Sequence, residues 1–253
     1  MIRDNEFIYL NINVTREQKE IVMLYQDSSE KDTQQQNLLY RVYGWMFIGL
    51  AITAGIAYYI ATTPALISFI YSGWAPLLFL MIAQIGLVIA LSLFLPRLSF
   101  PVAASLFLLY SATMGATMAS IFIMFTASSI FVTFLVAAGM FGVTSLYGYF
   151  TNADLTKMGS YLFMALVGLL IAMLVNMFVK STRMDMIISF VGVILFTLLT
   201  AYDTQKIKDI AQRLIGSHET MGKVALFGAL TLYLDFINLF LFLLNFTGQR
   251  RSE

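Results

Sequence analysis

The chain contains no cysteine and only one histidine, His218. Without cysteine there can be no disulfide, no thiolate metal site and no thiol catalysis. A single histidine in a polar stretch cannot build a multi-histidine metal cage. We therefore expect no resident cofactor.

Charge is also scarce in this sequence. Only 11% of the residues are charged and 59% are hydrophobic, whereas an ordinary soluble domain carries about 25% charge. This deficit indicates a polytopic membrane protein whose main partner is the lipid bilayer. The net charge of +1 provides no bulk attraction to nucleic acid, so no nucleic-acid partner is expected.

Long apolar stretches follow one another after residue 40, each close to the ~20 residues that a spanning helix needs. They lie near 42–62, 75–95, 101–124, 130–150, 159–179, 186–206 and 225–246. The segments between them are too short for an extramembrane domain. The sequence therefore predicts an all-α integral membrane protein, with a seven-helix bundle at 41–248 and a short tail at 249–253.

Residues 1–40 are polar and lack the apolar core of a signal peptide. We expect them to form a flexible cytoplasmic tail. With this tail inside, the inner segments hold eleven lysines and arginines and the outer segments hold four. Positive charge is enriched in cytoplasmic loops, so this bias predicts a cytoplasmic N-terminus and an external C-terminus. A re-entrant last segment would instead leave the C-terminus inside.

Acidic residues are absent from Thr33 to Ala153, yet each of the last two apolar segments contains one aspartate, Asp203 and Asp235. A carboxylate in a bilayer is costly, and such residues mark ion pathways or proton relays. At about 100° per residue, Asp235 shares one helix face with Thr231 and Asn238. This polar stripe should face the bundle interior or a water-filled cavity.

The two aspartates differ in their expected depth. Asp235 lies ~15 Å into its predicted helix at ~1.5 Å per residue, whereas Asp203 lies a few residues from the end of its own. They meet only if tilt, a helix break or a cavity closes the gap. If they meet, they would share a proton and titrate as a unit. Once deprotonated, they would offer oxygen ligands for weak, transient calcium binding, as permeation requires.

Simpler roles are open for the same residues. Lys206, one helical turn after Asp203, could form a local ion pair with it at the membrane surface. Asp235 could be a buried acid that joins helices through Asn238 and Thr231. In either case the aspartate would serve structure and not transport.

The second predicted span contains two further polar residues of interest. Arg97 follows Pro96 at its inner end. It is either a positive-inside anchor that extends to the head groups or a counter-charge that reaches the acidic pair. Gln84 lies in the middle of the span, where a packing hydrogen bond is the simpler interpretation.

Small residues spaced four apart predict close helix contacts, because they let backbones approach in lipid. Two such ridges are formed by Ser111, Gly115 and Ala119 and by Ala138 with Gly142.

Two segments resemble the signature of the Bax inhibitor-1 family, also called transmembrane Bax inhibitor motif proteins. They are Ala201–Ile207 (AYDTQKI) and Gly228–Phe240 (GALTLYLDFINLF). Three other stretches are similar to the bacterial inner-membrane branch of this family. They lie at Val42–Met46, Leu109–Ala112 and Ala138–Gly148. The resemblance covers residues 40–248.

The resemblance implies a seven-helix fold with the last helix central, and a pH-sensitive passive calcium leak in an inner membrane. By their motifs, Asp203 and Asp235 correspond to the family's proton sensor, and Arg97 lies where the family has a latch to that pair. Some bacterial relatives also have an acid within the second helix. This chain has only Ile82–Gly86 (IAQIG) there, so a pore path through that acid is not supported.

Two other kinds of function compete with the leak. One is a membrane interaction protein that does not transport and that modulates a membrane-bound AAA protease or a stress or cell-death response through its N-terminal tail. The other is an intramembrane aspartyl protease, in which two aspartates act as an acid–base dyad. The Gly-x-Gly-Asp motif of such proteases is missing, because Asp203 follows Tyr202 and Asp235 follows Leu234. We therefore expect no enzymatic activity.

Overall fold

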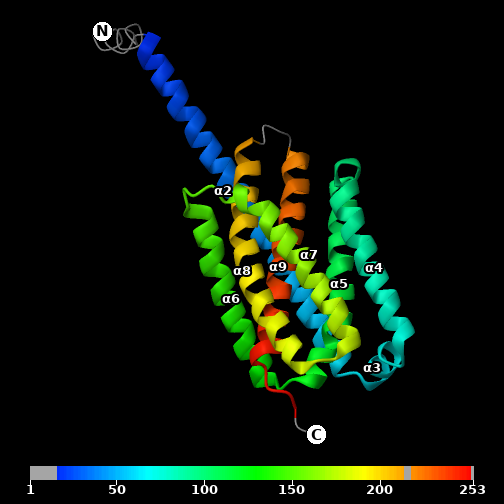
Figure 1. The fold of residues 1–253 in the computed structure, drawn as a ribbon. Coiled ribbons are helices and arrows are strands. Elements are labelled where there is room, and N and C mark those ends of the chain that lie inside the picture. Colours follow the sequence, from blue (N-terminus) through cyan, green and yellow to red (C-terminus); the bar gives the residue numbers. More distant parts are fainter. Residues whose placement is uncertain (1–15, 214–217, 252–253) are drawn as a thin grey trace.

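The computed structural model describes residues 16–213 and 218–251 and shows a bundle of long helices (Figure 1). In chain order the elements are α2 (Arg16–Ala61), α3 (Pro64–Ile70), α4 (Trp74–Phe94), the 3-10 turn η1 (Leu95–Arg97), α5 (Phe100–Met124), α6 (Ala127–Phe150), the 3-10 turn η2 (Leu155–Met158), α7 (Gly159–Val179), α8 (Thr182–Arg213) and α9 (His218–Thr247). A helix satisfies its backbone polar groups within its own segment, which hydrocarbon surroundings require.

Within the described ranges, seven helices are long and apolar enough to cross a membrane. The spans are Gln36–Ala61, Trp74–Arg97, Phe100–Met124, Ala127–Phe150, Leu155–Val179, Thr182–Ala211 and Thr220–Thr247. The predicted all-α architecture with seven membrane helices is confirmed.

Helix α2 extends well ahead of the first span. It begins at Arg16, so residues 16–40 share one helix with the span that begins at Gln36. In Figure 1 the N-terminal part of α2 projects from the bundle. Residues 1–15, the rest of the predicted tail, lie outside the described residues.

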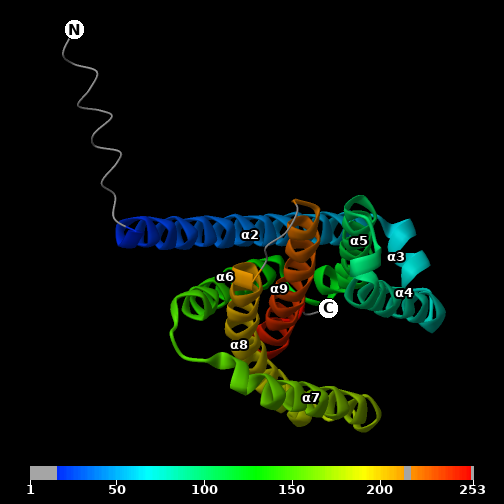
Figure 2. The ribbon, with the colours of Figure 1, turned by 90° about the horizontal axis from the view of Figure 1, so that it is seen from above.

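Helix α9 occupies the centre of the bundle, as Figure 2 shows from above. Its most apolar stretch is 72% buried, against at most 44% in any other span. It packs against α2, α5, α6 and α8. By contrast, α4 packs mainly on α5 and α7 mainly on α8, so these two helices lie at the periphery and apart from each other. The prediction that the last helix is central is confirmed.

The contact of α2 with α5 depends on a small residue. A Cβ added at Gly115 would lie 2.7 Å from the carbonyl oxygen of Thr53. Ser111 and Ala119, one turn before and after Gly115, are fully buried. The first predicted ridge of small residues is therefore confirmed as a helix seam.

The second predicted ridge is wrong at Gly142, whereas Ala138 packs against the core. Nothing lies within 4 Å of a Cβ added at Gly142. Helix α6 approaches α8 at Gly148 instead, where an added Cβ would lie 2.2 Å from the carbonyl oxygen of Ala201. Gly148 and Ala201 each belong to a segment that carries the family resemblance, so the close approach joins two such segments.

The last span is a continuous helix and not a re-entrant hairpin. Helix α9 runs without interruption from His218 to Thr247, and its end lies at the opposite side of the bundle from the N-terminal part of α2 (Figure 1). The chain that follows α9 is tied to the α5–α6 connection, where the Thr126 N–H donates to the Gln249 carbonyl at 3.1 Å.

Candidate functional site

Asp203 lies deeper in its helix than the sequence predicted. Helix α8 continues past the predicted end at residue 206 to Arg213, and its span extends to Ala211. The roughly two helical turns that follow Asp203 within this span remove most of the expected mismatch in depth. Asp203 is 9% exposed and Asp235 is 4% exposed, so both belong to the buried interior.

The two aspartates interact directly across the contact of α8 with α9. The two side chains lie close enough for the ionisation of one carboxyl group to depend on the other. Among the described residues, Oδ2 of Asp235 is buried without any hydrogen-bond partner. A buried carboxyl oxygen without a partner is costly. The site therefore has unused capacity to accept a hydrogen bond.

Lys206 does not neutralise this pair at close range. It acts electrostatically on Asp203, but its side chain is exposed and lies over the ring of Tyr202, 5.7 Å from the ring centroid. Within the part of the chain that the structure describes, no ion pair joins Lys206 to Asp203. The alternative of a local ion pair at the surface is not what the structure shows.

Thr204, the residue after Asp203, begins a chain of hydrogen-bonded hydroxyl groups that crosses to two neighbouring helices. Thr204 of α8 hydrogen-bonds Ser145 of α6 at 2.9 Å, and Ser145 in turn hydrogen-bonds Tyr43 of α2. These bonds join three helices at the level of Asp203. They tie α8 to α6 and α2 beside Asp203.

Gln205 fixes the connection between α6 and α7 to the same segment of α8. Its Nε2 donates to the carbonyl of Ala153 at 2.8 Å, and its Oε1 accepts from the N–H of Leu155 at 2.8 Å. Lys208 donates to the carbonyl of Tyr149 at 2.7 Å. The AYDTQKI segment therefore does two things: it supplies Asp203 and it anchors an inter-helix loop.

Thr231 and Asn238 share a face of α9 with Asp235, as predicted, but they do not hold its carboxyl group. The Thr231 hydroxyl donates to the carbonyl of Phe227 at 3.0 Å, and Asn238 Nδ2 donates to the carbonyl of Leu234 at 2.8 Å. Both bonds are made within α9. Asp235 is therefore not used to join helices through these two side chains.

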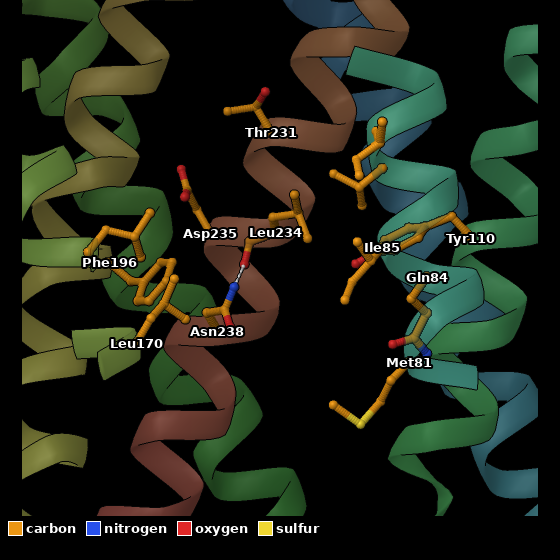
Figure 3. A pocket seen from close by; sticks show the side chains of 13 residues that line it. Met81, Gln84, Ile85, Tyr110, Leu170, Phe196, Thr231, Leu234, Asp235 and Asn238 are labelled. Atoms are coloured by element: carbon orange, nitrogen blue, oxygen red, sulfur yellow. Dashed lines mark hydrogen bonds between the residues drawn. The ribbon is translucent and has the colours of Figure 1, made fainter. Parts of the chain in front are cut away.

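A cavity of about 570 Å³ adjoins Asp235 (Figure 3). Side chains of α4, α5, α7, α8 and α9 line it, and most of its surface is apolar. Its apolar lining includes Met81, Ile85, Leu166, Leu170, Phe196 and Leu234. Its polar groups are those of Gln84, Tyr110, Thr231, Asp235 and Asn238. A mostly apolar pocket with a few convergent polar groups is the usual form of a small-molecule site.

A model of the family described as "Inhibitor of apoptosis-promoting Bax1" matches residues 35–252, which include both aspartates and every span. The chain belongs to the Bax inhibitor-1 family. The resemblance inferred from the AYDTQKI and LYLDFIN segments is confirmed.

Several bacterial proteins are similar to this chain over most of their length. The inner membrane protein YbhL of Escherichia coli K12 is 49% identical, over 85% of this chain and 93% of that protein. An uncharacterized protein of Borreliella burgdorferi is 44% identical, over 96% of this chain and 100% of its own length. An uncharacterized protein of Deinococcus radiodurans is 43% identical, over 86% of this chain and 92% of its own length.

The latch residue implied by the Bax inhibitor-1 resemblance, Arg97, stays a prediction. It lies in η1 at the end of the second span, and its side chain is exposed. Over residues 16–213 and 218–251, no ion pair links Arg97 to Asp203 or Asp235. Gln84, in the same span, donates from Nε2 to the carbonyl of Thr113 at 3.0 Å and to Thr117 Oγ1 at 2.7 Å. The packing interpretation of Gln84 is confirmed.

Sequence reasoning missed the supporting residues of the site. Thr204, Gln205 and Ser145 are buried polar residues, and none of them was singled out. The signal was present for Thr204 and Gln205, since they directly follow Asp203 in a segment that is otherwise part of a membrane span. Ser145 could not have been found in this way, because its role depends on which helix lies opposite.

Proposed function

We propose that this protein is a passive, pH-sensitive cation leak, with calcium as the ion, in a bacterial inner membrane and with its N-terminus in the cytoplasm. The observation that carries the proposal is the contact of Asp203 with Asp235 inside the bundle. Buried carboxyl pairs in membrane helices serve ion pathways and proton relays. The name of the Escherichia coli relative, an inner membrane protein, supports the location.

Protons and cations would compete for the same oxygen atoms. Two carboxyls in contact share a proton and titrate as a unit. With the proton bound, the pair offers little charge to a cation. Without it, both carboxylates attract one, and carbonyl groups and water complete the ~6–8 oxygen ligands that calcium takes. Two carboxylates alone would hold calcium weakly, so that it could leave again.

Conduction would require the helices around Asp235 to separate. The cavity beside Asp235 has a mostly apolar lining, and apolar constrictions close ion pathways by excluding water. Helices α4 and α7 have the fewest neighbours, so they are the helices best able to move. Arg97 lies at the end of the α4 span, and such a movement would carry it toward or away from the acidic pair as a latch.

Calcium flux into liposomes that contain the purified protein tests this proposal. We would compare wild type with Asp203→Asn, Asp235→Asn and Arg97→Ala at mildly acidic and mildly alkaline pH. Asp154→Asn is a matched control, because the Asp154 side chain is 52% exposed and outside the spans. We expect the first three changes to alter the pH response and the control to preserve it. No flux above empty liposomes, from folded protein, would reject the leak.

A non-transporting interaction protein is the second candidate, and the projecting part of α2 favours it (Figure 1). A helix that leaves the bundle could contact a membrane-bound AAA protease or another stress-response partner. The test is a truncation that removes residues 1–35, which keeps the buried Leu38 and Leu39 in the core. Loss of protease restraint in cells with normal flux in liposomes would support this role.

A further inference from the structure

The cavity beside Asp235 opens sideways, toward the hydrocarbon of the bilayer. Its lining side chains Ile85 of α4 and Leu170 of α7 are 58% and 51% exposed. Figure 2 shows α4 and α7 standing apart at the periphery of the bundle. Both residues lie near the middle of their spans, Trp74–Arg97 and Leu155–Val179. A molecule dissolved in the middle of the bilayer can therefore reach the cavity without passing through water.

Hydrogen-bond acceptors belong to the residues that line the cavity. Asp235 Oδ2 is buried without a partner in the described structure. Both amide hydrogens of Gln84 are directed to Thr113 and Thr117, and Asn238 Nδ2 donates to Leu234. The carbonyl oxygens of Gln84 and Asn238, the second amide hydrogen of Asn238 and the Tyr110 hydroxyl are then left to bind a ligand. In Figure 3 Asp235 extends from α9 on the side of α8, and Gln84 lies across from it on α4.

We propose that this cavity binds a lipophilic primary amine that enters from the bilayer between α4 and α7, with its nitrogen on Asp235 and its alkyl chain along the apolar wall. A volume of about 570 Å³ suits a ligand of moderate size, since such sites hold roughly 300–1,000 Å³. An amine supplies hydrogen-bond donors to the oxygen acceptors of these side chains.

Proton transfer within the site explains why an amine is favoured over an alcohol. A neutral amine can dissolve in hydrocarbon, whereas an ammonium ion cannot do so cheaply. Once in the cavity, the amine nitrogen takes the proton that the carboxyl pair shares: an N–H bond forms and an O–H bond breaks. The product is an ammonium beside two carboxylates, with no change in total charge. Charge-assisted hydrogen bonds of this type are the strong ones.

The bound amine would occupy the oxygen atoms that the proposed leak uses, so it would block the leak. This consequence rests on the proposed function, whereas the binding itself does not. The two can therefore be measured separately on the same preparation.

The experiment is photolabelling of the full chain in lipid nanodiscs with an alkylamine that carries a diazirine on its chain. The matched probe is the alcohol with the same diazirine chain. We expect the amine to label the segments of α4 and α7 that contain Ile85 and Leu170. Asp235→Asn should weaken this labelling at least roughly tenfold, as loss of a charged hydrogen bond predicts.

A second variant keeps the result interpretable if Asp235→Asn disturbs the fold. Leu170→Trp fills the cavity and leaves both aspartates in place, so it should abolish labelling. Leu174→Trp is its control: Leu174 lies on the same helix, is 59% exposed and does not line the cavity. Equal labelling by the alcohol, or labelling that survives both Asp235→Asn and Leu170→Trp, would overturn the proposal. Specific labelling without any calcium flux would reject the leak and retain the amine site.

Discussion

Asp203 of α8 and Asp235 of α9 interact through their side chains in the interior of the bundle. The two helices run in opposite directions in Figure 1. Asp203 precedes the end of α8 and Asp235 follows the start of α9, so the two residues lie at a similar depth. Under the proposed function the two carboxyls would titrate as one unit, so neither would act as a sensor alone.

The first prediction concerns the coupling of this pair. Because one proton is shared, Asp203→Asn and Asp235→Asn should each remove the pH response of calcium flux. The double variant should resemble either single variant, since the shared proton is already lost in each. Flux from liposomes measured at a series of pH values checks this. Additive effects of the two changes would show that the carboxyls titrate separately.

The second prediction concerns Gln205, which is 8% exposed and bonded to Ala153 and Leu155. In Gln205→Leu both backbone groups lose their partner, and the free energy of unfolding should fall by roughly 1–3 kcal/mol. Hydrogen exchange of the Leu155 amide should become faster. Lys206→Gln, a change at the exposed neighbour, should leave both measurements unchanged.

The third prediction compares two glycines of α6. A Cβ at Gly148 would lie 2.2 Å from the Ala201 carbonyl oxygen, whereas nothing lies within 4 Å of one at Gly142. Gly148→Ala should therefore destabilise the protein by about 1–3 kcal/mol, as overpacking does. Gly142→Ala should stabilise it by up to about 1 kcal/mol, since alanine is the better helix former. Thermal unfolding in detergent measures both. Equal melting temperatures would contradict the close contact of α6 with α8.

Hydropathy predicted the spans correctly because the requirement for satisfied backbone groups acts within each segment. It misplaced the end of α8, since Lys206 and Lys208 made the segment after Asp203 look like a loop outside the membrane. In the structure, Lys208 donates a hydrogen bond to the carbonyl of Tyr149, and Gln205 is buried. These partners belong to another helix and its loop, and no local pattern reveals them.

The small-residue ridges show the same limit. Ser111, Gly115 and Ala119 face another helix, whereas Gly142 has open space beside it. Both ridges have the same spacing, so spacing alone cannot distinguish a helix seam from a face turned to lipid. The aspartates were found because a carboxylate in a membrane span is costly wherever it lies. Their supporting partners depend on how the helices are arranged.

The fourth prediction concerns Asp154, which lies outside the spans and caps η2. The Thr156 hydroxyl donates to this carboxyl, as does the Thr156 N–H at 3.1 Å, and these bonds lower the pKa of Asp154. Because the pKa of Asp154 is lower in the folded protein, the cap stabilises the fold at pH values above the unfolded pKa of about 3.9. This stabilisation is lost as the pH falls through the folded-state pKa. In Thr156→Val the pKa of Asp154 should rise. Carbon-13 NMR of labelled aspartate carboxyls measures it, and an unchanged pKa would contradict the cap.

The fifth prediction concerns orientation, and the absence of cysteine makes it simple to test. The excess of lysine and arginine in alternate segments predicts a cytoplasmic N-terminus, and the spans then place Ser72 and Ser128 outside and Ser99 and Asn152 inside. All four side chains are exposed, so a cysteine at each should react with maleimide once reagent reaches it. In cells whose outer membrane is permeabilised and whose inner membrane is intact, a membrane-impermeant maleimide should label Ser72→Cys and Ser128→Cys. The Ser99→Cys and Asn152→Cys variants should react only after the inner membrane is opened. The reverse pattern would invert the molecule and place the AYDTQKI end of α8 on the external side.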